Sequence, residues 1–279
     1  MIDDLARPRG PYSLALTARL AGDATRRFRE GRFVARLPER AEAWQLPDGR
    51  VRLRAETETG LERLRFVLAL DDDHSEFVRR FARDPLLGRT VRELRGLRVL
   101  RVPTVAGALL RAVCGQLIDS RSARLLERTI VRAVAKESGD GLYEPPRRES
   151  FAPLAPLELR RLGLAERKAA ALVRVCRALD LERLRDAPTT AVVSRIVRER
   201  GLGPWSAGVV CLEGLGRREH GLVGDLGLVK LLGALRGRWV EGWETAELLE
   251  PYGEWAGLAS VYLLNGFGRG LVPLSARAA

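Results

Sequence analysis

The sequence predicts a mainly α-helical protein that begins with a small α+β domain. Three observations support this prediction. From residue 74 onward, apolar residues recur at the three- and four-residue spacing of amphipathic helices. The region before residue 72 instead contains short segments with strand-like patterns, separated by turn residues. The acidic run Asp71-Asp72-Asp73 stands between the two regions. We therefore expect an N-terminal domain at 1–72 and a helical region at 73–279.

Within the first region, residues 13–20, SLALTARL, alternate apolar and polar side chains and predict a half-buried strand. Residues 23–30 predict a short helix. Residues 32–37 and 51–56 predict antiparallel strands, and a turn at Pro47-Asp48-Gly49 precedes the second one. Residues 57–70 predict a helix with one apolar face.

The acidic run can cap the helix that follows it, because carboxylates favour helix N-termini. A metal site is not expected there, since three adjacent carboxylates diverge on any backbone. The second region then predicts helices at 74–83, 89–94, 104–118, 120–136, 157–162, 166–179, 189–200, 206–215, 226–235, 246–250 and 254–265.

The chain carries a formal net charge of +12 and has a pI of about 10.7, which favours a polyanionic partner. Arginine supplies nearly all of the 48 basic side chains, so genomic base composition is an alternative source of the charge. The sequence contains no apolar run long enough to cross a bilayer, and its first residues lack a signal-peptide core. We expect a soluble, cytoplasmic protein without a membrane partner.

The three cysteines, Cys114, Cys176 and Cys211, are far apart and lie in apolar helical segments. The absence of a CxxC pair argues against a zinc or iron–sulfur site. Buried free thiols in a reducing compartment are expected. The two histidines are too few to predict a metal site or a Ser–His–Asp arrangement.

The most informative stretch runs from Val197 to Lys230. A glycine turn, Gly201-Leu202-Gly203, is followed by Pro204 and an apolar helical segment, and the carboxylate of Asp225 comes twenty positions after Trp205. Backbone N–H groups at such a helix start can donate to a phosphate. The turn alone is equally compatible with an ordinary connection between two helices. A phosphate-binding turn combined with one acid suits chemistry on a nucleic acid.

Four segments together resemble the helix-hairpin-helix DNA glycosylase superfamily, and most closely its DNA-3-methyladenine glycosylase II family. GLGPWSA is similar to the hairpin GIGxWTA, and GDLGL to the segment that carries the catalytic aspartate. RAVCGQLI is similar to RAxxGQLV, and LGLAERKAAAL to LGLxxxKAxxL. The likeness covers about residues 74 to 270. It implies the helix-hairpin-helix DNA glycosylase fold, with two helical lobes and a cleft, preceded by a small α+β domain, with the hairpin at about 196–210.

The resemblance implies a role for each matching residue. Asp225 is the expected catalytic acid, although it can also cap the next helix. Trp205 and Gln116 are expected in the substrate pocket. Leu117 is the expected wedge that fills the space left by a flipped nucleotide. Simple core packing is the alternative for Trp205 and for Leu117. The other expected DNA-binding residues of the hairpin are Gly201, Leu202, Gly203, Pro204 and Ser206.

Bifunctional members of the superfamily carry a lysine at the position of Trp205, and that amine attacks the sugar. The resemblance therefore implies a monofunctional hydrolase without lyase activity. No organic cofactor is expected, and a structural Na⁺ or K⁺ is a candidate at the backbone carbonyls of Val197, Glu199 and Leu202. Arg217 and Arg218 are either DNA contacts or a solvated turn.

The base pocket departs from the family pattern. Val209 and Leu264 stand where alkylpurine-specific relatives often carry aromatic rings. Five aromatic residues near them in sequence can replace those rings: Trp239, Trp243, Tyr252, Trp255 and Tyr262.

We expect a monomeric base-excision-repair enzyme that acts on damaged double-stranded DNA, with an alkylated purine as the lesion. The alternatives are a damage-binding protein without catalysis and a glycosylase for another lesion class.

Overall fold

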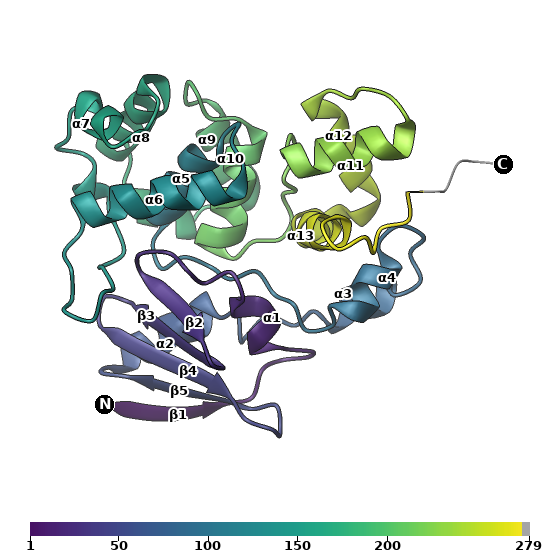
Figure 1. The fold of residues 1–279 in the computed structure, drawn as a ribbon, viewed down its shortest axis with the longest axis horizontal. Coiled ribbons are helices and arrows are strands. Elements are labelled where there is room, and N and C mark those ends of the chain that lie inside the picture. The colour runs from purple at the N-terminus through teal and green to yellow at the C-terminus, as the bar shows by residue number, and fades with distance from the viewer. Residues whose placement is uncertain (275–279) are drawn as a thin grey trace.

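The structure is a computed structural model that describes residues 1–274. Its N-terminal part is a five-stranded antiparallel sheet in the order β1-β5-β4-β3-β2 (Figure 1). The strands are β1 Ile2–Ala6, β2 Arg26–Arg29, β3 Arg32–Arg36, β4 Arg40–Gln45 and β5 Val51–Ala55. Strands β3 and β5 confirm the two predicted segments, but they pair with β4 between them rather than with each other. Helix α2, Glu58–Val67, follows β5 and confirms the predicted helix.

Two predictions in this part were wrong. Residues 13–20 form helix α1, Leu14–Ala18, instead of a strand. The Ser13 hydroxyl accepts the N–H of Leu16, which caps the helix, and the buried side chains Leu14, Thr17 and Ala18 have helical spacing. Residues 23–30 form strand β2 instead of a helix. There the Asp23 carboxylate accepts the backbone N–H of Thr25 in a local turn, and the chain then pairs with β3.

The rest of the chain is helical, as predicted. The α-helices are α3 Ser75–Phe81, α4 Gly88–Glu93, α5 Val105–Gly115, α6 Ser120–Val134, α7 Pro156–Arg161, α8 Glu166–Ala178, α9 Thr189–Val197, α10 Pro204–Val209, α11 Leu226–Arg236, α12 Thr245–Leu249 and α13 Ala256–Phe267. Five short segments have other helical geometries: η1 Arg148–Ser150, η2 Leu181–Arg185, η3 Val210–Leu215, η4 Gly242–Glu244 and η5 Glu250–Trp255. Segment η3 is a π-helix that continues α10 directly, so the predicted helix 206–215 changes geometry halfway. Within residues 1–274, no helix is both long and apolar enough to cross a membrane.

The helices form two lobes, each with its own core, and the sheet has a third core (Figure 1). One lobe contains α5 to α10, with Phe151 and Ile196 among its buried residues. The other combines α3 and α4 with the C-terminal helices α11 to α13, so the chain enters this lobe, leaves it and returns. The core of the sheet extends from Ala6 to Leu70, and the domain boundary at residue 72 stays a prediction.

A buried ion cluster joins the sheet domain to the first lobe. Arg111 of α5 donates to Asp23 at 2.9 Å, to Glu127 of α6 at 2.9 Å and to Glu213 of η3 at 2.6 Å. Arg26 donates to Asp23 at 2.8 Å. Although burial opposes ionisation, the two guanidinium groups hold the pKa of Asp23 well below its ordinary value. Burial raises the pKa of Glu127. The cluster fixes α5 about one turn before the C-terminal end that carries candidate site residues.

The three cysteines lie inside the helical lobes as free thiols, which confirms the prediction that they are buried. Burial raises the pKa of both Cys176 and Cys211 to about 12. These thiols are therefore protonated and unreactive near neutral pH.

Candidate active site

Asp225 is the N-cap residue of α11. Its Oδ1 accepts the backbone N–H of Gly227 at 2.8 Å and that of Leu228 at 3.4 Å. These N–H groups have no partner within the helix, and the positive end of the helix dipole favours a carboxylate there. Asp225 is half-buried. The capping interpretation of Asp225 is therefore correct, and it leaves the second carboxylate oxygen for another contact.

The second oxygen of Asp225 accepts the indole N–H of Trp205. The distance from Nε1 to Oδ2 is 2.9 Å, across twenty residues of sequence. The Trp205 ring is half-buried and lies against the end of α5, where a methyl group on Gly115 would approach Cη2 to 2.7 Å. The ends of α5, α10 and α11 thus meet at the indole. Trp205 orients the carboxylate, a role that its sequence position alone did not reveal.

The hairpin turn connects α9 to α10. Gly201 has a φ of 92°, a conformation that strongly favours glycine, and the N–H of Leu202 donates to the carbonyl of Glu199 at 3.0 Å. The Leu202 side chain is buried, whereas Gly201 and Pro204 are exposed. Pro204 is the first residue of α10, where its missing N–H costs nothing. Gly201 and Pro204 are therefore the parts of the hairpin that are open to a ligand.

Gln116 ties this turn to the end of α5. Its side-chain nitrogen donates to the carbonyl of Gly201 at 2.8 Å and to the Ser206 hydroxyl at 3.1 Å. Ser206 is buried, so its hydroxyl faces Gln116. Sequence reasoning placed Gln116 in the substrate pocket and Ser206 among the DNA contacts. In the structure both side chains bind each other, and this contact fixes the hairpin.

Leu117 is the most exposed large apolar side chain in the described part of the chain, at 83%. It follows α5 with a φ of 58°, a left-handed conformation that is uncommon for leucine. Asp119 then caps α6 by accepting the N–H groups of Arg121 and Ser122. Core packing as an explanation of Leu117 is therefore wrong, because the turn presents this side chain to solvent.

Similarity to known proteins agrees with this geometry. A comparison with protein-family models finds no match. The chain is 28% identical over 204 residues to a DNA-3-methyladenine glycosylase of Bacillus subtilis (strain 168). The aligned region covers 70% of this chain and 67% of the relative. Among solved structures, a 3-methyladenine DNA-glycosylase from Archaeoglobus fulgidus superposes with a TM-score of 0.81 and 19% identity, over 95% of this chain and 98% of that one.

A second solved structure is the 8-oxoguanine glycosylase/lyase of Clostridium acetobutylicum in complex with double-stranded DNA. It superposes with a TM-score of 0.79 and 16% identity, over 97% of this chain and 99% of that one. At such identities the two superpositions establish the fold alone. The sequence relative and the shared fold both support the helix-hairpin-helix DNA glycosylase superfamily that the four motif segments resemble. The predicted fold class is thereby confirmed.

Most aromatic residues proposed for the base pocket lie elsewhere. Tyr252, Trp255 and Tyr262 are buried in the core of the second lobe, so their proposed role as accessible pocket walls was wrong. Their rings pack on Phe77 and Phe81. The remaining two candidates, Trp239 and Trp243, are 79% and 66% exposed, in the segment that follows α11.

Val209 and Leu264 also belong to the second lobe's core region. Val209 is buried, and Leu264 is half-buried beside the first turn of α11, where a methyl group on Gly227 would lie 2.4 Å from Cδ2 of Leu264. Gly242, just before Trp243, packs on Gly224, the residue before Asp225. Leu264 and the Trp205 indole therefore both lie beside the start of α11, where Asp225 is the N-cap.

The two arginines after η3 contact other parts of the same chain. Arg217 donates to backbone carbonyls of Leu184, Arg185 and Ala187. The Arg218 guanidinium lies 3.7 Å from the centre of the Trp255 ring. Neither expectation, DNA contact or solvated turn, describes Arg217, whose guanidinium holds η2 against η3.

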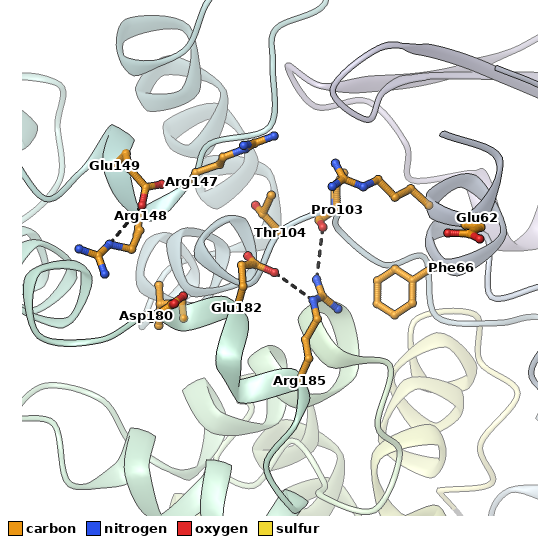
Figure 2. A pocket seen from close by; sticks show the side chains of 12 residues that line it. Glu62, Phe66, Pro103, Thr104, Arg147, Arg148, Glu149, Asp180, Glu182 and Arg185 are labelled. Atoms are coloured by element: carbon orange, nitrogen blue, oxygen red, sulfur yellow. Dashed lines mark hydrogen bonds and ion pairs between the residues drawn. The ribbon is translucent and has the colours of Figure 1, made fainter. Parts of the chain in front are cut away.

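A hollow of about 410 Å³ lies between α2 and the N-terminal ends of α5 and η2. Figure 2 shows Arg185 reaching Pro103 and Glu182 across it, beside the ring of Phe66. Four arginines and four acids line this hollow, so their charges balance. The hollow lies at the first turn of α5, whereas Leu117 follows the last turn of that helix. An eleven-residue helix separates its two ends by about 16 Å. The hollow is thus separate from the site around Asp225.

Sequence reasoning assigned no role to Lys168, although its motif, LGLAERKAAAL, was singled out. Lys168 lies on α8, and its Nζ donates to the backbone carbonyl of Gln116 at 2.5 Å. The lysine of this motif therefore reaches the segment that carries Leu117.

Proposed function

We propose that this protein is a monofunctional DNA glycosylase that removes an alkylated purine from double-stranded DNA and leaves an abasic site. The observation that carries the proposal is the fixed carboxylate of Asp225. It is held by an indole N–H and a helix start, close to an exposed hairpin turn and an exposed leucine. Such an arrangement combines a catalyst with groups that bind phosphate and occupy a gap in a duplex.

In this proposal Asp225 acts through its charge. As the N-glycosidic bond breaks, positive charge develops on the deoxyribose, and a carboxylate held in one position stabilises that charge. Asp225 can also accept a proton from the water that attacks the sugar. Trp205 is a positioning residue in this step, because its N–H fixes Oδ2 at 2.9 Å. Preorganisation of this kind avoids the cost of reorienting the carboxylate during the reaction.

We propose that the protein has no lyase activity because of the groups that surround Asp225. Within residues 1–274, its three hydrogen-bond donors are two backbone N–H groups and one indole, and none is an amine that could attack the sugar. The tryptophan stands at the position where the resemblance places the nucleophilic lysine of bifunctional relatives.

An alkylated purine is proposed as the lesion for two reasons. Alkylation at N3 or N7 makes the base cationic and weakens its glycosidic bond, so a carboxylate without a general acid can suffice. A cationic base is also attracted to the face of an indole, and Trp205 adjoins Asp225. The name of the Bacillus subtilis relative supports this choice.

We further propose that the protein acts as a monomer and that the hairpin binds DNA phosphate. A monovalent cation fits the hairpin, because the Glu199 carbonyl accepts one N–H and retains a second lone pair for a metal. The carbonyls of Val197, Glu199 and Leu202 would hold it. Such an ion would add positive charge near a bound phosphate.

The proposal is tested with duplex DNA treated with a methylating agent. We expect the wild type to release free methylated purine and to leave alkali-labile abasic sites, and Asp225→Asn to release little. Binding without release by the wild type would favour a damage-binding protein instead. Strand cleavage without added base, or a covalent complex trapped by borohydride, would reveal a lyase.

A further inference from the structure

The segment Gln116-Leu117 is held at three points by side-chain hydrogen bonds. The Gln116 side chain reaches Gly201 and Ser206 of the hairpin, and its backbone carbonyl accepts the Lys168 ammonium. All three bonds involve Gln116, and none involves Leu117 itself. Both the side chain and the backbone carbonyl of Gln116, the residue before the exposed leucine, are therefore held by hydrogen bonds.

This anchoring matters because Leu117 has an unfavourable backbone conformation. A left-handed leucine relaxes to a right-handed or extended conformation unless its neighbours prevent it. Such a relaxation would redirect the side chain, since it changes φ by more than about 100°. The carbonyl of Gln116 belongs to the peptide that precedes Leu117, so a bond to this oxygen restricts the φ rotation of Leu117 directly.

We propose that Lys168 is a positioning residue for the Leu117 wedge. Its ammonium holds the Gln116–Leu117 peptide so that the leucine side chain points outward before DNA binds. Lys168 is half-buried, and its neighbour Arg167 is exposed on the same helix, so the two residues differ in contact rather than in charge. The inference rests on the proposed function, because it assigns Leu117 the task of filling the gap left by a flipped nucleotide.

Two other roles for Lys168 predict different behaviour. If the ammonium bound DNA phosphate, its removal would weaken binding to any duplex. It would also reduce the slope of log affinity against log salt concentration by about one. If it were a nucleophile, the wild type would form a covalent complex under borohydride that Lys168→Met would abolish.

The test compares affinity for a duplex with an abasic-site analogue and affinity for the same duplex undamaged, because the gap in the analogue accepts a wedge and intact DNA does not. We expect Lys168→Met to reduce this preference about tenfold, the effect of losing one charged hydrogen bond. Lys168→Arg, which keeps the charge and the donors, restores at least part of the preference. Arg167→Met is the matched control and leaves the preference unchanged.

A double-mutant cycle with Leu117→Gly isolates the wedge. Glycine adopts positive φ freely, so this variant keeps the turn and removes the side chain. Lys168→Met should then add no further loss of preference in the Leu117→Gly background. Equal effects of Lys168→Met in both backgrounds, an unchanged preference, or a uniform loss for both duplexes would overturn the inference.

The same experiment separates this inference from the proposed function. Binding to the analogue requires no catalysis, so a protein that releases no base but shows the expected pattern would refute the glycosylase activity alone. A wild type that releases base while Lys168→Met keeps its full preference would refute the positioning role alone. Unfolding measured for each variant identifies losses that come from instability.

Discussion

The contact between Trp205 and Asp225 predicts a specific energetic coupling. Asp225 offers two acceptor oxygens, one to the helix start and one to the indole N–H. Asparagine has one oxygen and one NH₂ group, so Asp225→Asn must place its NH₂ against either the indole or the backbone N–H groups. One good hydrogen bond is lost in either orientation, which costs about 1–2 kcal/mol. Asparagine otherwise caps a helix as well as aspartate does.

The coupling appears in a double-mutant cycle with Trp205→Phe, which removes the indole N–H. In that background the NH₂ group of the introduced asparagine meets no opposing donor, so Asp225→Asn should cost about 1 kcal/mol less than in the wild type. Urea unfolding of the four proteins measures this difference. Additivity within about 0.5 kcal/mol would refute the coupling. Base release by Asp225→Asn should fall by at least about 10²-fold, whether or not the coupling is present.

Three further predictions concern the surroundings of the site. Arg111→Met should destabilise the protein by about 3–5 kcal/mol in urea unfolding, because the buried Glu127 loses its ion-pair partner and the buried Asp23 keeps only Arg26. The control Arg183→Met, at an exposed pair, should change stability by less than about 0.5 kcal/mol. Burial alone would raise the pKa of Asp72, but His74 and Arg101 lower it to about 2 from an ordinary 3.8. The ionised carboxylate therefore contributes about 2 kcal/mol to folding stability above about pH 4, and this contribution is lost as the pH falls towards 2. The stability difference between wild type and Asp72→Asn should therefore shrink over that range, and a constant difference would contradict the assignment. Gly115→Ala should reduce base release by displacing the Trp205 ring, whereas Gly22→Ala, where a methyl group meets nothing, should be silent in the same assay.

The helical region was predictable because its information is local. Apolar spacing alone located each helix to within a few residues, from α3 to α13. The errors occurred in the sheet domain, within the first 45 residues, where the signals conflict. Residues 13–20 alternate like a strand, yet the Ser13 cap and the burial of Leu14 and Ala18 make a helix. Strand β4 was missed because RAEAWQ contains few β-formers and gains its place from neighbours on both sides.

The candidate site was predictable as a set of residues but not as a set of contacts. Motif spacing identified Asp225, Trp205 and Gln116, and their roles stay predictions. The bond between the Trp205 indole and Asp225 depends on the path of the chain between them, which no local pattern encodes. The contribution of Lys168 was missed for the same reason, because its partner is a backbone carbonyl 52 residues away.

The π-helical segment η3 has a consequence for comparing this chain with its relatives. A π turn holds one residue more than an α turn. The separation of twenty residues between Trp205 and Asp225 therefore includes one residue that a regular helix would not need. A relative with an uninterrupted helix here can present the same pair of side chains with one residue fewer. Sequence alignments through Val210–Leu215 should accordingly permit a gap of one position, since otherwise the segment that carries Asp225 is matched out of register.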